Sequence, residues 1–523
     1  MTSANERAMT IAPPHAGTTT PSAGDVAATP TSRSPRPARR RVLDYLPLAA
    51  VLLVQAVASL RLDNSAFQDE ALYLYTGHWV LDHWLHGVEL YSDPGDWFAG
   101  APQLYPVLAA LLDDVGGLGL TRLFSTLCML SATAAVYWTA NTLFGRPGQV
   151  RIGTFAALVF AVSGPVLFLT HLATYDAPSY AAVAWALAVG VWLARAERQR
   201  SRWWAVLVGV LLALAVLLKY ASAIDAPFVL LAVAAASLGD PSRRWRGLGT
   251  SLVAGSAALA VLALSAVTWA RPLLEGVVDS TIRRQSLAPE TTAQLFGRVV
   301  SDAGPMIALG LLGGVLVLRR RPALGAVLLV ASVAAPLYQV HTGESVSLHK
   351  TLVLGLVFAA PLAGRLCAAL VDRWWGTPLV AAALLGCLLH GTSVSERLFT
   401  GWPDTTPLTQ ALTPIVEATP GVRIAGENPE PLQYALREQT QPWQWASTYP
   451  GAFRYEGLSD LPAFERALTD RYLGVVFLDG ASDIGRQLEP RMASLGYTQT
   501  AVVRTPDAAH EWGIWQPSDD LAD

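Results

Sequence analysis

The adjacent carboxylates Asp69 and Glu70 are the residues of this chain that most directly suggest chemistry. They lie in the segment NSAFQDEALYLYTGHW (64–79), just beyond the first long apolar run. Charged residues at the mouth of a membrane span are costly to hold near lipid, and they commonly mark a functional site. A carboxylate there suits a general base. The structural alternative is a helix start, because Asp and Glu in a first helical turn complement the helix dipole.

Further polar residues stand at the ends of later apolar runs. Asp176 lies in THLATYDAPSY (170–180), and Lys219 and Tyr220 lie in LLKYAS (217–222). An ammonium group at the membrane edge suits a lipid phosphate. The structural alternatives are that Lys219 merely snorkels to the interface and that Asp176 caps a helix.

A second group of basic residues follows later in the chain. His349 and Lys350 close the segment HTGESVSLHK (341–350), and Arg283 and Arg284 follow the seventh apolar run. We expect these residues to contact the same phosphate as Lys219. We also expect Asp69, Asp176, Lys219 and Lys350 to line one cavity open to both lipid and water.

The cofactor stays unknown at this stage, and a divalent metal is the one candidate. His341 and Glu344 are the candidate ligands, with His349 close by in the sequence. His78, Asp82 and His86 follow one another at four-residue spacing on one helical face, for which a solvated polar face is the plainer reading.

The composition indicates a membrane protein. Of the 523 residues, 52% are hydrophobic and 15% are charged, and the mean hydropathy is +0.36. Soluble domains carry roughly a quarter of charged residues, so the surplus of apolar residues points to the bilayer. The net charge of -3 is uninformative, and no nucleic-acid partner is expected. Cys128, Cys367 and Cys387 all fall inside apolar runs, which suggests neither a disulfide framework nor a CxxC metal site.

About eleven spans of roughly 20 residues are expected. They are 43–60, 120–143, 152–170, 178–194, 203–219, 226–239, 248–269, 303–318, 323–340, 351–370 and 377–393. The arginine-rich connections 36–41, 146–151, 195–202, 239–246 and 319–322 alternate with connections that hold fewer basic residues. By the positive-inside rule the arginine-rich ones face the cytoplasm. This alternation places Asp69, Asp176, Lys219 and Lys350 together on the outer side.

Three parts follow from this pattern. Residues 1–42 are expected to be a disordered cytoplasmic tail, and 43–393 a transmembrane domain with a long first outer loop over 61–119. In that loop, 102–114 reads as an interfacial helix and 70–86 as a helix lying flat on the membrane. Residues 394–523 are more polar and read as a small extracytoplasmic α/β domain, with strands at 421–427, 472–479, 497–505 and 511–516.

Several segments together carry a resemblance to the GT-C glycosyltransferases of family 39. They are the acidic pair in the first outer loop, APQLYPVLAALL followed by GLGLTRL (101–123), TYDAPSYAAVAWAL (174–187) and SVSLHKTLVLGLVFAAPLAG (345–364). This family includes the protein O-mannosyltransferases and the lipid A aminoarabinose transferases, and the resemblance covers roughly 43–400. The chain departs from the family at Ala101-Pro102, where a double proline is usual.

The resemblance implies a membrane enzyme of a bacterial-type cell envelope. It would transfer a hexosyl or pentosyl group, with inversion, from a polyprenyl-phosphate donor to a glycan, lipid or protein acceptor. Asp69 would be the general base, with Glu70 and Asp176 beside it in the site, and the basic residues would bind the phosphate. The alternative is a transporter or flippase for a lipid-linked sugar, which needs ionisable groups near mid-span. A structural subunit is a third class, and it leaves the outer polar residues unexplained.

Overall fold

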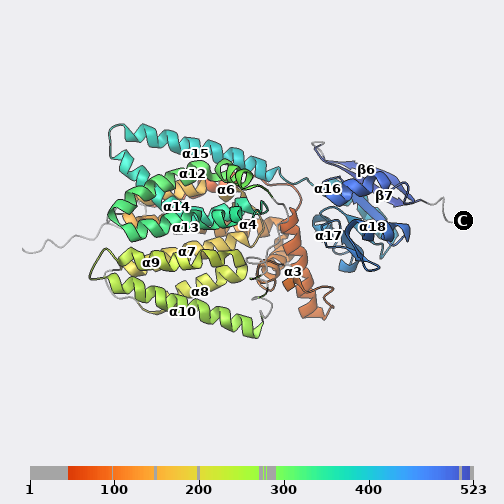
Figure 1. Ribbon diagram of the computed structural model, residues 1–523, viewed down its shortest axis with the longest axis horizontal. Coiled ribbons are helices and arrows are strands. Elements are labelled where there is room, and N and C mark those ends of the chain that lie inside the picture. Colours follow the sequence, from red (N-terminus) through yellow and green to blue (C-terminus); the bar gives the residue numbers. More distant parts are fainter. Residues whose placement is uncertain are drawn as a thin grey trace, which may run out of the picture. The chain divides into compact units, whose positions relative to one another are not determined.

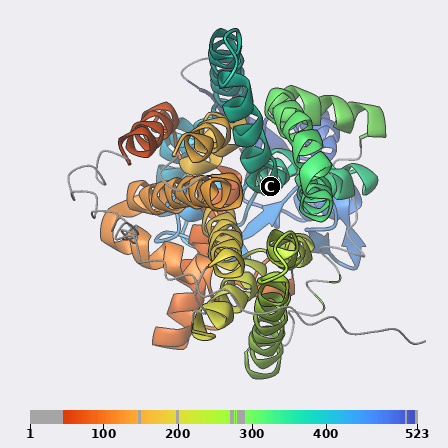
Figure 2. The same cartoon turned by 90° about the vertical axis from the view of Figure 1, so that its left-hand side faces the viewer.

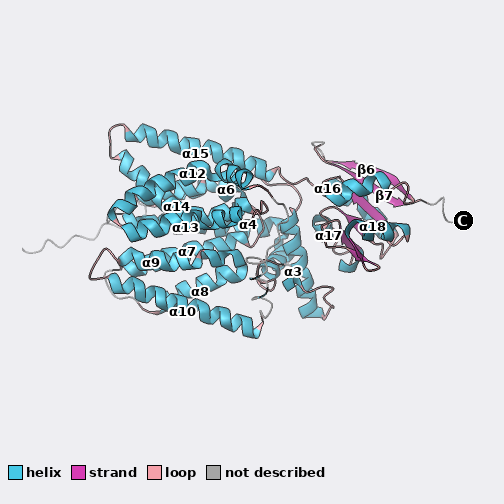
Figure 3. Ribbon diagram, in the orientation of Figure 1, coloured by secondary structure: helices cyan, strands magenta, loops and turns pink. Residues whose placement is uncertain are grey.

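The computed structural model describes residues 45–96, 98–145, 150–196, 201–269, 275, 278, 290–505 and 509–518. The chain is helical up to Phe399, and strands occur only beyond that point among these residues (Figure 1, Figure 3). The tail expected over 1–42 lies outside the described residues, as do Arg283 and Arg284.

The first part of the chain consists of helices. In chain order these are α2 (Leu46–Ser59), α3 (Gln68–His86), η1 (Pro94–Asp96), α4 (Tyr105–Phe144), α5 (Arg151–Ala161), α6 (Gly164–Thr170), α7 (Asp176–Arg195), α8 (Trp203–Leu218), η2 (Tyr220–Ile224), α9 (Ala226–Ser237), α10 (Arg244–Thr268), α12 (Thr292–Arg320), α13 (Pro322–His341), α14 (Leu348–Val371) and α15 (Gly376–Phe399). The polytopic helical class expected from the sequence is confirmed.

Seven of the described helical segments are long and apolar enough to cross a membrane, or eight if α5 and α6 form one broken span. These two helices are bent by 77° at a break just before Pro165. The other expected spans correspond to α2, α8 and the second part of α4, of which α2 and α8 are apolar but shorter. The count of eleven therefore stays a prediction.

The centre of the bundle is formed by α7 and α14. In the most apolar stretch of each, 78% and 83% of the residues are buried, against 17% for α10 and 22% for α15. Large apolar side chains such as Leu259 on α10 and Leu389 on α15 are exposed, as expected where helices face lipid. Figure 2 looks along the helices and shows α10 and α15 at the periphery. The charged residues at the start of α7 and α14 are thus brought to the middle of one end of the bundle.

The first loop forms its own helices at that end. α3 begins at Gln68, as expected for a helix over 70–86, and runs crosswise to the bundle (Figure 1). α4 is broken at Gly116 and Gly117, and Gly117 has φ +66°, a conformation that glycine adopts without a steric penalty. The break separates the segment predicted as an interfacial helix from the segment predicted as a span.

The second part of the chain is an α/β domain. Its elements are α16 (Thr406–Ala418), β1 (Ile424–Gly426), α17 (Glu430–Ala435), η3 (Pro442–Gln444), β2 (Trp445–Ser447), β3 (Arg454–Tyr455), β4 (Leu458–Ser459), α18 (Asp460–Thr469), β5 (Val475–Leu478), α19 (Asp483–Leu488), η4 (Glu489–Arg491), β6 (Tyr497–Arg504) and β7 (Glu511–Pro517). A five-stranded sheet has the order β2-β1-β5-β7-β6, in which β2, β1 and β5 are parallel and β7 and β6 are antiparallel. The predicted α/β domain is confirmed, although β2, β3, β4 and α16 were not predicted.

The alternation of side chains along β5 explains why helices pack on both faces of the sheet in this domain. Successive side chains of a strand point to opposite faces of the sheet. Val476 packs with Phe464 of α18 on one face, and Phe477 packs with Leu412 of α16 on the other. All four residues of β5 are buried because helices cover both faces, as is usual around parallel strands.

The first loop and the C-terminal domain should lie on the same side of the membrane, because both follow the same parity of spans. Ser92 and Ala493 are exposed, and cysteines introduced there should both react with a membrane-impermeant maleimide in intact cells. Trp374, which is 93% exposed between α14 and α15, should react as a cysteine only after permeabilisation. The parent protein measures any background from its three free cysteines. Reaction at only one of the two outer positions would break the predicted topology.

Candidate active site

Two carboxylates and two lysines meet at one end of the bundle. The ammonium of Lys350 forms an ion pair with Asp69, and its Nζ lies 3.7 Å from Oδ2 of Asp176. The ammonium of Lys219 pairs with Oδ1 of the same Asp176 and donates to the hydroxyl of Tyr180 at 3.0 Å. The four residues whose convergence the sequence predicted are therefore in one connected cluster.

Four different elements position this cluster. Asp69 is in the first turn of α3 and Asp176 opens α7, while Lys219 lies directly after α8 and Lys350 is in the first turn of α14. Ser347 precedes α14 with φ +64° and sets the direction in which that helix begins. Because α7 and α14 are the buried helices of the bundle, their first turns can place charges in its interior.

Exposure distinguishes the two carboxylates. The side chain of Asp69 is 43% exposed, whereas that of Asp176 is fully buried. Lys219 and Lys350 are 7% and 5% exposed. Asp69 is thus the carboxylate that a water-borne molecule can reach, and Asp176 is the anion that holds both lysines from inside.

Aromatic side chains enclose the cluster on one side. The ring of Tyr73 lies 4.6 Å from that of Tyr175 and 5.3 Å from that of Phe98, and Tyr105 stands edge-on to Tyr73. Lys219 Nζ lies 5.6 Å from the centre of the Tyr175 ring, within cation–π range. Burial raises the pKa of both Tyr73 and Tyr175, so both phenols stay neutral. This wall lowers the local dielectric and strengthens the electrostatic interactions of the lysines.

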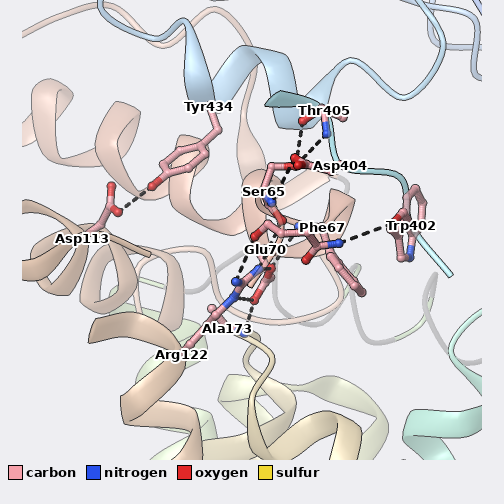
Figure 4. A network of polar contacts seen from close by, with 11 residues as sticks. Ser65, Phe67, Glu70, Asp113, Arg122, Ala173, Trp402, Asp404, Thr405 and Tyr434 are labelled. Carbon is pink, nitrogen blue, oxygen red and sulfur yellow. Dashed lines mark hydrogen bonds and ion pairs between the residues drawn. The ribbon is translucent and has the colours of Figure 1, made fainter. Parts of the chain in front are cut away.

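Glu70 is fully buried and serves a different purpose from its neighbour. Its carboxylate forms a bidentate pair with Arg122 of α4, with distances of 2.9 and 2.7 Å. It also accepts the backbone N–H of Phe67 at 3.0 Å and that of Ala173 at 2.7 Å (Figure 4). The bond to Phe67 is the N3-to-N-cap half of a capping box. Both oxygens are engaged inside the protein, so the geometry favours a structural part for Glu70 over the catalytic part that the sequence suggested.

Other residues expected in the site lie at its edge or elsewhere. Tyr220 is buried and packs with Leu217. His349 is half-buried and stands edge-on to Phe168 with ring centres 5.4 Å apart. Tyr220 directly follows Lys219 in the chain, and His349 directly precedes Lys350. The parts expected of them in phosphate binding stay proposals.

The residues suggested as metal ligands are spread out. His341 is exposed at the end of α13, and the buried Glu344 accepts the backbone N–H of Val346 at 2.7 Å. Within the described ranges, no three His, Cys, Asp or Glu side chains are grouped so that they could hold a metal ion. His78 instead bonds Asp113 at 2.8 Å.

Three buried polar residues near the site were not predicted. Arg122, the partner of Glu70, stands inside the segment GLGLTRL, where the apolar pattern hid it. Tyr180 donates to Asp176 at 3.1 Å, and a tyrosine at the fourth place after an aspartate in a helix is the signal that could have revealed it. Asp225 is buried before α9, and its place at the end of an apolar run gave the same signal as Asp176.

The C-terminal domain contacts α3 directly beside the cluster. Gln68 donates to Glu430 of α17 at 3.1 Å, and the hydroxyl of Tyr434 donates to Asp113 at 2.6 Å. Figure 4 shows a second junction, where Ser65 meets the backbone and side chain of Thr405. Burial raises the pKa of Glu430 to about 6, since few groups there stabilise its charge.

Comparisons with known proteins agree with this fold. A family model described as dolichyl-phosphate-mannose-protein mannosyltransferase matches residues 106–269. ArnT from Cupriavidus metallidurans in the apo state has a TM-score of 0.63 at 15% identity, over 93% of this chain and 100% of that one. The chain has the GT-C fold. No curated protein sequence matches significantly.

Two further solved structures support the fold. The oligosaccharyltransferase AglB from Archaeoglobus fulgidus has a TM-score of 0.59 at 13% identity, over 93% of this chain and 75% of that one. The arabinofuranosyltransferase AftD from Mycobacteria has a TM-score of 0.54 at 17% identity, over 91% of this chain and 40% of that one. Together with the family model over residues 106–269, they confirm the predicted resemblance to the GT-C membrane glycosyltransferases.

Replacement of Glu70 should destabilise the protein. Removing one partner of a buried ion pair typically lowers the free energy of unfolding by about 3–5 kcal/mol, because the other charge stays buried. Glu70→Gln should lower the thermal unfolding temperature of the purified protein clearly. Asp82→Asn, an exposed carboxylate on the same helix, should leave it unchanged. The double variant Glu70→Gln/Arg122→Gln should lose less than the sum of the two single variants. Strict additivity would contradict the pairing.

Glu430 should make stability depend on pH. Its folded pKa of about 6 lies above the ordinary 4.5, so the charged form is penalised only in the folded state. The penalty is absent below about pH 4.5 and complete above pH 6. Glu430→Gln should therefore be more stable than the wild type at pH 8, by about 2 kcal/mol, and equally stable at about pH 3.5, where the carboxyl is protonated in both states. The exposed Glu438→Gln is the matched control. The same pH dependence of stability in the two variants would refute the raised pKa of Glu430.

Proposed function

We propose that this protein transfers a sugar from a polyprenyl-phosphate carrier to a hydroxyl group of an acceptor outside the cytoplasm. The observation that carries the proposal is the cluster of Asp69, Lys350, Asp176 and Lys219. It combines a solvent-accessible carboxylate with two buried ammonium groups at one end of a membrane bundle. Solved structures with this fold include ArnT bound to undecaprenyl phosphate and AglB in complex with a dolichol-phosphate, which supports a lipid-linked donor.

The lysines suit the leaving phosphate. A phosphate oxygen can replace a carboxylate as the partner of an ammonium group, and charge-assisted bonds of this kind are strong in a site shielded from water. Lys350 is the better placed of the two, because its ammonium already stands between Asp69 and Asp176. In this proposal the donor phosphate replaces Asp69 as the partner of Lys350, which frees the Asp69 carboxylate. Lys219 keeps its ion pair with Asp176. Arg283 and Arg284 remain candidates for further phosphate contacts.

Asp69 acts as the general base. It accepts the proton of the acceptor hydroxyl as the oxygen attacks the anomeric carbon of the sugar. The bond from that carbon to the phosphate oxygen breaks, and polyprenyl phosphate leaves with the electron pair. A single displacement of this kind inverts the anomeric carbon. The 43% exposure of the Asp69 side chain supports this part, because the acceptor must arrive from water.

Asp176 and Glu70 act through their neighbours. Asp176 pairs with Lys219 and lies 3.7 Å from Lys350, so it fixes the spacing of the two ammonium groups. Glu70 fixes the first turn of α3, and with it the position of Asp69. The charged groups gather at helix ends, a placement that suits a transferase better than the transporter alternative. The sugar stays open between a hexosyl and a pentosyl group.

The replacement Asp69→Asn tests the proposal. A strain that lacks this chain should accumulate the donor, and its lipid extract, analysed by mass spectrometry, then provides the substrate. The purified wild type should consume the accumulated lipid and release polyprenyl phosphate. Asp69→Asn should do so about a hundredfold to ten-thousandfold more slowly, because the amide cannot accept the proton. It should still bind the donor, since both lysines remain.

A matched control is Asp82→Asn, which removes an exposed carboxylate from the same helix. It should turn over at the wild-type rate. Asn is also accommodated well in the first turn of a helix, so Asp69→Asn should unfold at nearly the wild-type temperature. Near-normal turnover in Asp69→Asn would remove the catalytic assignment. Unchanged levels of every lipid-linked sugar in the deletion strain would remove the proposed reaction.

A further inference from the structure

A polar cavity lies at the far end of α7 from Asp176. It has a volume of about 530 Å³ and is bounded by the end of α7, the turn between α9 and α10, and the junction of α12 with α13. Figure 1 shows the turn from α9 to α10 at the end of the bundle away from α3. α7 has 20 residues, so at 1.5 Å per residue the cavity lies roughly 30 Å from the candidate active site.

The charges on this cavity are strongly one-sided. Four arginines line it, Arg195, Arg243, Arg320 and Arg321, and among the described lining residues Asp240 is the single acid. The arginines come from three places in the chain, with Arg320 and Arg321 adjacent, so the fold brings like charges together from distant segments. Such crowding is unfavourable unless an anion offsets it.

The protein holds two of these guanidinium groups in place, those of Arg243 and Arg321. Arg243 donates to the carbonyl of Arg195 at 2.8 Å and pairs with Asp240 at 3.1 Å. Arg321 donates to the carbonyl of Leu143 at 2.8 Å. Each of these contacts uses some of the N–H groups of a guanidinium and orients the N–H groups that remain. Fixed, partly buried donors lose little freedom when a ligand binds, which is the arrangement found in anion sites.

We propose that this cavity binds a phosphate-bearing anion, either the head group of an anionic membrane lipid or free phosphate. Guanidinium groups match phosphate oxygens in geometry, and basic pockets between transmembrane helices bind lipid head groups. The positive-inside rule accounts for arginines in loops, but it does not account for their convergence on one cavity. Arg244 and Arg319 show the difference, since they follow the same rule and do not line it.

The test compares two double variants of the full chain that remove the same charge. Arg195→Gln/Arg320→Gln removes two lining arginines, and Arg244→Gln/Arg319→Gln removes two neighbours outside the cavity. Binding of phosphatidylglycerol and of phosphatidylcholine to the purified protein is measured by native mass spectrometry. Binding of inorganic phosphate is measured in a parallel arm by equilibrium dialysis.

We expect the first double variant to bind phosphatidylglycerol about tenfold more weakly than the wild type, and the second to bind it unchanged. The ligand is free phosphate if inorganic phosphate binding is lost in the first double variant alone and the wild type does not prefer phosphatidylglycerol to phosphatidylcholine. Equal losses in both variants would show a general effect of charge and overturn the site, as would wild-type binding of both anions by the first. The exposed Arg320→Gln alone provides the comparison if the double variant unfolds.

Discussion

The ion pair between Glu70 and Arg122 is the constraint on which the geometry of the candidate active site depends. Two buried charges are expensive to remove from water, and the expense is offset only when each charge finds several partners. Glu70 meets this condition with Arg122 and two backbone N–H groups, and Arg122 also donates to the carbonyls of Asn64 and Ser65. One pair therefore joins the start of α3, the second part of α4 and the turn before α7.

This pair explains how a connection between two spans can hold the proposed base in a fixed position. Asp69 directly precedes Glu70 in the first turn of α3, so fixing the one carboxylate fixes the backbone of the other. Successive residues of a helix point about 100° apart, which turns Glu70 into the protein and leaves Asp69 partly open. Asp176 follows Ala173 by three residues, so the same pair also sets the position of the carboxylate that holds both lysines.

The sequence predicted which residues form the cluster better than it predicted the part that each of them takes. Asp69, Asp176, Lys219 and Lys350 stand at the ends of apolar runs, where a charge is conspicuous because the bilayer disfavours it. Arg122 is separated from Glu70 by 52 positions and lies within an apolar segment, and no local pattern links such a pair. Glu70 itself could not be separated from Asp69, since adjacent acids carry the same signal. In the C-terminal domain the apolar strands β1 and β5 were predicted, whereas β2 follows the polar stretch 438–444 and belongs to no apolar run.

The C-terminal domain helps to hold the candidate active site in place. Glu430 and Tyr434 of the short helix α17 bond Gln68 and Asp113, and Ser65 is held by Thr405. These contacts lie on both sides of the turn that carries Asp69 and Glu70. The helix α3 is stabilised from the bundle by Arg122 and by packing on α4, and from the other side by α17. The carboxyl group of Glu430 is the weakest part of this brace, because it is buried with a single amide donor from α3 and becomes charged near pH 6. The stability of the brace, and with it the position of the proposed base, should therefore respond to the pH on that side of the membrane.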